Sequence, residues 1–436
     1  MINFEKKKNI ILIFLLLSAF QFIYSFIFPS YDITSNYWKT IEEFGSYKSY
    51  SYDSFDNSIA AKIYPLVSNY HINSDSAAQI LLAHDFPKQY FEGNHTFLNR
   101  PLYAFLVFLI SRPLHLISDS YSLTFAAGAL LNFALFLSAV ILFYSLVRKI
   151  ISNRVAFLSS VLLIFSPFTR VWLTQPETDI FGVFVVALTL YLLYDYMNNP
   201  NFKKLAIFSL LIGTLMLGKM LFAMPFFILL SAVFFKKYKE GFLFVLAFSL
   251  PLVLWYIIVT KVFGFNYYSK EMTDFDMYLI NGWFWNIFKS PWPETFKIFL
   301  NAIPSFIFSL VYGFLLLPII LAMVGFKNVI FNRKNFFSVA FVFSFFILFF
   351  VMNYYTPRHG FLLFPIIYPS AILGTERIAR FLGKFVRVGS NDSRSVLIKK
   401  YYPIVICFAI YLILIIISNL NIFEVFKYDG GYPWLP

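Results

Sequence analysis

The amino-acid sequence predicts an all-α membrane protein with about 11 transmembrane helices, an interfacial helix and a large first extracytoplasmic loop. Hydrophobic residues make up 59% of the 436 residues and charged residues only 13%, whereas soluble domains are about half apolar and a quarter charged. The apolar residues fall in blocks long enough to cross a bilayer, such as 121–147. The basic residues cluster in short segments between these blocks, which is typical of cytoplasmic loops.

The charge and cysteine content exclude two further interpretations. A net charge of +13 would indicate nucleic-acid binding in a soluble protein. Here the basic residues lie in short loops between apolar blocks, where they orient a membrane protein, so we expect no nucleic-acid partner. The single cysteine, Cys407, excludes an intramolecular disulfide.

The N-terminal segment predicts a membrane anchor. Lys6, Lys7 and Lys8 precede an apolar run from 9 to 28, and no small-residue cleavage site follows it. We therefore expect a retained first span with a cytoplasmic N-terminus. The next segment, 29–101, holds five basic and eight acidic residues, and its balance of −3 predicts an extracytoplasmic loop.

The next two apolar segments have different predicted roles. Segment 102–117 is short and interrupted by Arg112 and Pro113, which makes it a poor spanning sequence. One crossing must connect the external loop to the basic residues that begin at Arg148, so we expect 102–117 to lie at the outer interface and 121–147 to span the membrane. Further spans are expected at 154–172, 179–197, 205–218, 220–235, 241–263, 298–325, 336–352, 361–377 and 403–419.

The two spans between 205 and 235 are too short to cross the membrane fully. Two crossings of a core of about 30 Å need roughly 40 residues at about 1.5 Å each. Both flanks are basic, so a hairpin is still required, and its tip at Gly218 and Lys219 would lie below the outer membrane surface. A lysine at that depth needs a partner or a water-filled pocket, which is the first indication of a functional site.

The predicted organisation has three parts. Residues 1–380 form a transmembrane catalytic core with external loops 29–101 and 264–297, residues 381–402 form a cytoplasmic basic loop, and residues 403–436 form the last transmembrane helix and an external C-terminal tail. We expect a multi-pass protein of the cytoplasmic membrane whose polar clusters face the extracytoplasmic side.

Two acidic clusters stand where predicted external loops meet helices. Asp75 lies at or near the N-cap of a predicted helix. Glu177 and Asp179 open the predicted span 179–197. Capping and favourable interaction with the helix dipole are the ordinary roles of such residues, and these structural alternatives stay open for both clusters.

Two basic residues belong to the same predicted side of the membrane. Lys219 lies at the recessed hairpin tip, and Arg358 lies in a tight loop between two predicted spans. The alternatives are a lysine that extends to the interface and an arginine that is simply solvated. His359 has no histidine, cysteine or carboxylate at metal-ligand spacing nearby in the sequence, so no zinc site is predicted there.

Together, the four clusters predict transfer of a group from a phosphate-bearing donor anchored in the same membrane. Carboxylates can bind a hard divalent cation or act as a general base. Lysine and arginine can hold a phosphate. The residues by themselves do not identify the group that is transferred.

The order of these motifs resembles the GT-C superfamily of polytopic glycosyltransferases, and within it the protein O-mannosyltransferase and aminoarabinose-transferase group. The resemblance covers roughly residues 9–380. The matching motifs, in chain order, are Asp75 with the small residue Ala83 eight positions on, Arg100-Pro101-Leu102-Tyr103, Gln175-Pro176-Glu177-Thr178-Asp179, Gly218-Lys219 with Pro225, and Arg358 with Pro365.

The resemblance implies a sugar donor on polyprenyl phosphate and a lipid, protein or glycan acceptor that enters from the external side. Asp75 would be the general base or a metal ligand, and Glu177 or Asp179 would help to hold a divalent cation, Mg or Mn. A metal site would then include Asp75 and Glu177. Lys219 and Arg358 would neutralise the leaving phosphate, and the sugar would be inverted.

One departure and several rival functions accompany this resemblance. The first motif often carries an acidic pair, whereas this chain has Asp75-Ser76 and so only one acid. A flippase or transporter of a lipid-linked glycan would also place basic residues in a membrane cavity, and a polysaccharide polymerase or ligase would use a similar donor. A purely structural membrane protein is the remaining alternative. The sequence shows no inverted repeat of the kind found in many transporters.

Overall fold

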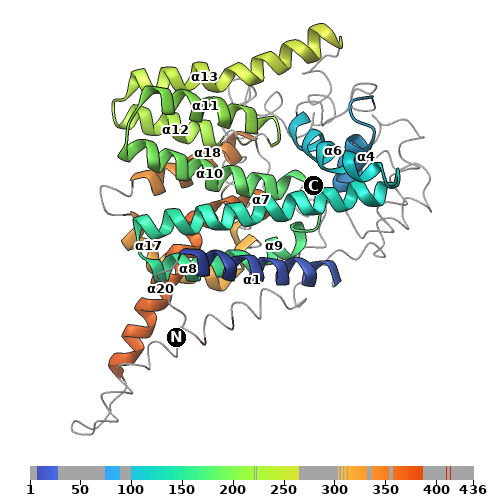
Figure 1. The fold of residues 1–436 in the computed structure, drawn as a ribbon. Coiled ribbons are helices and arrows are strands. Elements are labelled where there is room, and N and C mark those ends of the chain that lie inside the picture. The colour runs from blue at the N-terminus through green and yellow to red at the C-terminus, as the bar shows by residue number, and fades with distance from the viewer. Residues whose placement is uncertain are drawn as a thin grey trace, which may run out of the picture.

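The computed structural model describes most of the predicted transmembrane core. The described residues are 7–27, 74–88, 100–219, 221, 223–264, 316–330, 336–352 and 357–385, with separate residues between 303 and 315 and at 409 and 413. Every regular element among them is helical (Figure 1). The predicted all-α class is therefore confirmed.

Within the described ranges, five helical segments are long and apolar enough to cross a membrane. They are Lys8–Ile27, Tyr121–Ile150, Thr178–Asn198, Tyr238–Val262 and Arg358–Phe381. Shorter apolar helical segments lie at Pro101–His115, Asn153–Ile164, Ala223–Phe234 and Leu316–Phe326. These helices support the prediction of a multi-pass membrane protein, and most coincide with predicted spans within a few residues.

Helix α7 (Tyr121–Ile150) lies at the centre of the molecule (Figure 1). It packs against α1 (Lys7–Ile27), α8 (Asn153–Ile164) and α10 (Thr178–Asn198). Two shorter helices, α4 (Ser74–His84) and α6 (Pro101–His115), gather at one end of α7, where they also contact each other. Segments that are far apart in the sequence therefore meet at this end of the bundle.

The remaining helices extend this bundle on either side. Figure 1 shows α11, α12 and α13 beyond α10, and α20 near α8. Helix α11 packs on α13, α12 on α18, and α17 on α20. Their bounds are Phe202–Met216 for α11, Ala223–Phe234 for α12, Tyr238–Ile257 for α13, Leu316–Ile330 for α17, Phe336–Met352 for α18 and Phe364–Phe385 for α20.

The predicted span 154–172 is not one continuous helix, so this prediction was wrong in detail. Helix α8 ends at Ile164, and a separate helix, α9 (Pro167–Trp172), follows. The side chain of Ser166 accepts a hydrogen bond from the backbone N–H of Thr169, at 3.0 Å. Proline at the first position of α9 has no N–H to continue the α8 ladder, which explains the break.

The predicted span 298–325 is also divided. Leu315 has a φ of +66°, a left-handed conformation that a bulky residue rarely adopts within a helix. Helix α17 begins at the next residue. The start of the predicted span 361–377 is irregular too, because the short helix α19 (Pro357–Gly360) and a 3₁₀ turn (Phe361–Leu363) precede α20.

Several predicted segments lie largely outside the described residues. They are most of the external loop 29–101, the loop 264–297 apart from Gly264, most of the basic segment 381–402, and the final part, 403–436, apart from its two separate residues. The predicted interfacial segment 102–117 corresponds to α6, whose last turn contains Pro113. Its position relative to a membrane stays a prediction.

Candidate active site

The two acidic residues at the start of α10 are buried. Glu177 occupies the extended N-cap position and Asp179 the first turn, with exposed fractions of 5% and 2%. The Glu177 side chain makes no capping hydrogen bond. Buried carboxylates need a partner to remain charged, so their surroundings decide what they do.

Lys219 is the partner of Asp179. Its Nζ donates a hydrogen bond to Oδ1 of Asp179 at 2.6 Å, and the lysine is only 7% exposed. Helices α11 and α12 have 15 and 12 residues, fewer than the roughly 20 that a full span needs. The short hairpin thus ends with its lysine inside the protein, paired with a carboxylate.

Gly182 makes room for this lysine along α10. It lies one turn after Asp179, on the same face of the helix. A Cβ atom at position 182 would lie 3.0 Å from Cδ of Lys219. The absence of a side chain therefore lets the lysine stem pass along the helix to reach the carboxylate.

Arg358 joins the two acids from the other end of the chain. Its Nη1 donates to Oε1 of Glu177 at 2.6 Å and approaches Oδ2 of Asp179 at 3.4 Å. The guanidinium carbon lies 5.2 Å from the centroid of the Trp172 ring, in cation–π geometry. Arg358 belongs to the short helix α19 and has an exposed side-chain fraction of 19%.

We name the set Glu177, Asp179, Lys219 and Arg358 the charged cluster. Its two acids and two bases balance formally, and they come from three separate parts of the chain. The arrangement gives two cations that are held beside each other in a largely water-free environment. Such cations can neutralise a phosphate, and the carboxylates keep them charged and in position until one arrives.

A chain of hydrogen bonds supports the segment that carries the two acids. The hydroxyl of Tyr103 donates to Oδ1 of Asn132 at 3.0 Å. The amide nitrogen of Asn132 donates in turn to the backbone carbonyl of Gln175. Tyr103 and Asn132 are both fully buried, so this chain fixes the Gln175 backbone two residues before Glu177.

Two close backbone approaches complete the support. The N–H of Leu102 donates to the carbonyl of Leu217 at 3.1 Å, which connects the start of α6 to the hairpin tip. A Cβ atom at Gly128 would lie 2.7 Å from Cβ of Pro176, so only glycine permits this contact between α7 and the acidic segment. These contacts give the Pro-Leu-Tyr motif a structural role.

Helix α4 reaches the same segment through its first turn. The Ser76 hydroxyl donates to Oε1 of Gln175 at 3.3 Å, across 99 positions of sequence. Asp75 precedes Ser76 in α4, and its side chain lies outside the described residues. The helix that carries Asp75 therefore contacts the helix start that carries Glu177 and Asp179.

Some residues at this site were missed by the sequence reasoning. Trp172, Asn132 and Gln79 gave no signal, because isolated aromatic and amide residues are common in apolar helices. Gln79 is 1% exposed, and neither polar atom of its side chain makes a hydrogen bond among the described residues. His359, where the sequence predicted no zinc site, is partly buried next to Arg358.

The predicted metal pair Asp75 and Glu177 stays a prediction, because the Asp75 side chain lies outside the described residues. The Oε1 atom of Glu177 accepts a hydrogen bond from Arg358. Within the described part of the chain, a grouping of metal-ligand type is formed by His84, His115 and Asp119. A possible metal site of histidine and aspartate is therefore present, and the predicted choice of Mg or Mn stays a hypothesis.

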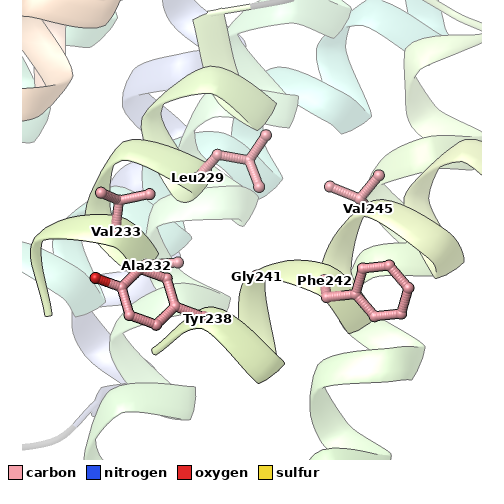
Figure 2. Close-up of a pocket in the computed structure, with 7 residues that line it drawn as sticks. All are labelled: Leu229, Ala232, Val233, Tyr238, Gly241, Phe242 and Val245. Atoms are coloured by element: carbon pink, nitrogen blue, oxygen red, sulfur yellow. The ribbon is translucent and has the colours of Figure 1, made fainter. Parts of the chain in front are cut away.

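A separate apolar pocket lies between α12 and α13. Figure 2 shows its lining side chains, which come from both helices. The lining residues are Leu229, Ala232, Val233, Tyr238, Gly241, Phe242 and Val245. It contains none of the residues of the charged cluster, so the candidate active site is defined by the polar contacts and not by this pocket.

The sequence matches one protein-family model. Residues 101–260 match the model described as dolichyl-phosphate-mannose-protein mannosyltransferase. The matched range includes Glu177, Asp179 and Lys219, but neither Asp75 nor Arg358. The match confirms the predicted resemblance and the predicted class, a membrane glycosyltransferase. No curated protein sequence matches the chain.

Two solved structures resemble the chain more distantly. ArnT from Cupriavidus metallidurans, in the apo state, is 11% identical at a TM-score of 0.45, and the similarity covers 80% of this chain and 69% of that one. The Archaeoglobus fulgidus oligosaccharyltransferase, in complex with Zn and sulfate, is 15% identical at a TM-score of 0.44, over 81% of this chain and 48% of that one. Similarities at this level do not identify corresponding residues.

Proposed function

We propose that the protein transfers a sugar from a polyprenyl-phosphate donor to an acceptor on the extracytoplasmic side of the cytoplasmic membrane, with inversion at the sugar. The observation that carries this proposal is the charged cluster, in which Lys219 and Arg358 are held together by two buried carboxylates. A buried pair of cations at the end of a membrane bundle fits a lipid-linked phosphate. The acceptor would be a lipid, a protein or a glycan.

The donor phosphate would take over part of the pairing within the cluster. Arg358 has the more exposed side chain of the two bases, at 19% against 9% for Lys219. Its planar guanidinium can bind two phosphate oxygens at once. As the glycosidic bond breaks, negative charge grows on the phosphate, so both cations would stabilise the transition state more than the ground state.

Asp75 would be the general base in this reaction. Glu177 and Asp179 are both engaged with the two cations, and an ion pair makes a carboxylate a poorer proton acceptor. The acceptor hydroxyl oxygen would attack the anomeric carbon, its proton would pass to Asp75, and the bond to the phosphate oxygen would break. One displacement releases polyprenyl phosphate and inverts the sugar. A divalent cation held by Asp75 and Glu177 would instead assist the departure of the phosphate.

Consumption of polyprenyl-phosphate sugars by the purified protein tests the proposal. The panel pairs several donors with a membrane extract as the acceptor source, and compares wild type with Asp75→Asn. Asp85→Asn is the matched control, because Asp85 is an exposed acid directly after α4. We expect turnover by wild type and the control and a loss of about 100-fold or more in Asp75→Asn, in line with the contribution of a general base.

Three results would contradict parts of this proposal. Turnover that survives Asp75→Asn would move the base to Glu177 or Asp179. Turnover only with diphosphate-linked glycans would favour a polymerase or ligase. A protein that consumes no donor but moves labelled lipid-linked glycan across reconstituted vesicles would be a flippase, which the same buried cations could serve.

A further inference from the structure

A second polar cluster lies at the opposite end of α4 from Asp75. His84 is the last residue of α4, His115 is the last residue of α6, and Asp119 lies in the linker to α7. The centroids of the two imidazole rings are 4.8 Å apart. One potential ligand atom from each of the three residues lies within 4.8 Å of the other two. Three chain segments thus bring two imidazoles and a carboxylate together.

Thr124 orients both imidazole rings. Its Oγ1 lies 2.9 Å from Nδ1 of His84 and 3.0 Å from Nε2 of His115, and the threonine is fully buried. A hydroxyl oxygen can accept two hydrogen bonds. When Thr124 accepts from both rings, the protonated nitrogens are those that face it, and the other nitrogen of each ring carries a lone pair.

The two remaining nitrogens face one carboxylate oxygen. Nε2 of His84 lies 3.6 Å from Oδ1 of Asp119, and Nδ1 of His115 lies 3.5 Å from the same atom. The His115 side chain is only 5% exposed, and its Nδ1 makes no hydrogen bond with any described residue. With Thr124 as the acceptor from both rings, two lone pairs and a carboxylate face one another.

The two nitrogen–oxygen distances are close to those between ligands around a tetrahedral zinc ion. Ligand atoms at the usual bond length of about 2.0–2.1 Å from zinc lie about 3.3 Å from each other. The two nitrogen–oxygen distances, 3.6 and 3.5 Å, are close to this value, and the two nitrogens lie within 4.8 Å of each other, so rotation of the side chains would complete the geometry. Zinc-ligating histidines regularly donate their other N–H to a neighbouring acceptor, and Thr124 is placed to accept from both rings.

We propose that His84, His115 and Asp119 form a zinc site. Two imidazole ligands favour zinc or a similar transition metal over Mg²⁺ or Ca²⁺, which prefer oxygen ligands. The carboxylate of Asp119 is 78% exposed, so the ion can enter from solvent and a water molecule can complete the fourth position.

The bound ion would fasten the end of α4 to α6 and to the start of α7. His84 lies nine residues after Asp75, which corresponds to about 13 Å along a helix. The site is therefore separate from the charged cluster and from the predicted pair Asp75 and Glu177. It would act on the proposed reaction only through the position of α4, and the inference does not depend on that reaction.

Metal binding to purified, tag-free protein in detergent tests the site directly. After treatment with a chelator, the full-length chain is titrated with Zn²⁺ by calorimetry and with Co²⁺ by visible absorption. We expect one ion per chain and an intense tetrahedral Co²⁺ spectrum in wild type. Thr124→Val should weaken binding by about 10- to 100-fold, and both His115→Ala and Asp119→Asn should weaken it further.

The controls separate a true loss of ligands from misfolding. Asp119 is exposed, so the metal-free Asp119→Asn variant should melt at the same temperature as metal-free wild type. Added zinc should raise the melting temperature of wild type but not that of the variant. Asp195→Asn removes another exposed acid, far from the site in the sequence, and should bind as wild type does. Wild-type protein that binds no ion, or binding that persists in all three site variants, would overturn the proposal. Binding that is lost only in Glu177→Gln would overturn it as well.

Discussion

The ammonium group of Lys219 lies 2.6 Å from Oδ1 of Asp179, although the two residues are 40 positions apart and both are buried. Removing two charges from water is costly, and a direct contact with good geometry is required to offset that cost. Arg358 adds a second cation to the same carboxylates. The relationship explains why a lysine is tolerated at the tip of a hairpin too short to cross a membrane twice.

We predict that Asp179→Asn destabilises the protein strongly. The substitution removes the charge that neutralises Lys219, and breaking a buried ion pair in this way costs about 3–5 kcal/mol. The double variant Asp179→Asn with Lys219→Met should recover much of the lost melting temperature, because the uncompensated charge is gone. Thermal unfolding in detergent, followed by circular dichroism, measures both effects.

The pair Asp195 and Lys204 is the matched control for this prediction. Asp195 also lies in α10 and contacts Lys204 at 3.4 Å, but both side chains are substantially exposed, at 41% and 52%. Exposed pairs contribute about 0–1 kcal/mol, so Asp195→Asn should barely change the melting temperature. Equal effects at Asp179 and Asp195 would contradict the burial argument.

Arg358→Lys should lower the rate of sugar transfer while the protein stays folded. Lysine keeps the positive charge but loses the planar group that contacts Glu177 and lies over Trp172. If Arg358 holds the donor phosphate in the transition state, kcat should fall by about 100-fold or more. Steady-state kinetics with the best donor of the panel check this, and an unchanged kcat would remove Arg358 from the proposed mechanism.

Gly182→Ala should disturb the charged cluster through packing alone. The new Cβ would lie 3.0 Å from Cδ of Lys219, so the lysine stem must shift and its contact with Asp179 lengthens. Gly241→Ala is the control in α13, where the nearest atom is Cβ of Ala232 at 3.2 Å and no charged group is affected. We expect a larger loss of kcat/KM in Gly182→Ala than in Gly241→Ala; equal losses would show that the lysine stem adapts.

The all-α class and most helix positions could be predicted from the sequence because apolar blocks and basic loops follow directly from membrane physics. The sequence also indicated that Lys219 needs a partner. It did not indicate that Asp179 would be this partner, since contacts across 40 residues depend on tertiary packing. The breaks at Ser166 and Leu315 were missed for a related reason: an apolar block shows where a chain can be buried, not whether its helix is continuous.

The grouping of His84, His115 and Asp119 could not be predicted from the sequence for the same reason. The pair Asp75 and Glu177 followed from family motifs and stays a prediction. His84 and His115 meet only because α4 and α6 end beside each other. Only the spacing of His115 and Asp119, one helical turn apart, was visible in the sequence, and one such pair is too common to predict a site.

We predict that the hydrogen-bond chain from Tyr103 to Gln175 contributes more to the free energy of unfolding than any single hydrogen bond in it. Asn132→Leu leaves the buried Tyr103 hydroxyl without its acceptor, at about 1–3 kcal/mol. It also removes one hydrogen bond from the Gln175 carbonyl, which still accepts from the N–H of Glu177 at 2.7 Å. Tyr103→Phe leaves only the Asn132 oxygen unpaired. The double variant should therefore lose less stability than the sum of the single variants, which chemical or thermal unfolding can test; simple additivity would argue against a connected chain.

The last prediction concerns two buried glutamines with opposite roles. Gln175 accepts a hydrogen bond from Ser76 at 3.3 Å. Gln79 is buried in the same helix as Ser76, one turn further on, and its amide makes no hydrogen bond with the described residues. A buried amide without a partner costs about 1–3 kcal/mol. Gln79→Met should therefore raise the melting temperature of the unliganded protein, whereas Gln175→Met should lower it.

Activity should change in a way that stability alone does not explain. Asp75 lies four positions before Gln79 on the same helix face. Gln79 is 1% exposed, so a polar acceptor substrate would pair with its amide only after local opening of the helix packing. The more stable Gln79→Met variant should then have a higher KM for the acceptor. Such a trade-off between stability and activity is common when a buried polar group serves function. If Gln79→Met lowers the melting temperature instead, its amide is paired in the native protein, and an unchanged KM would show that the acceptor does not contact it.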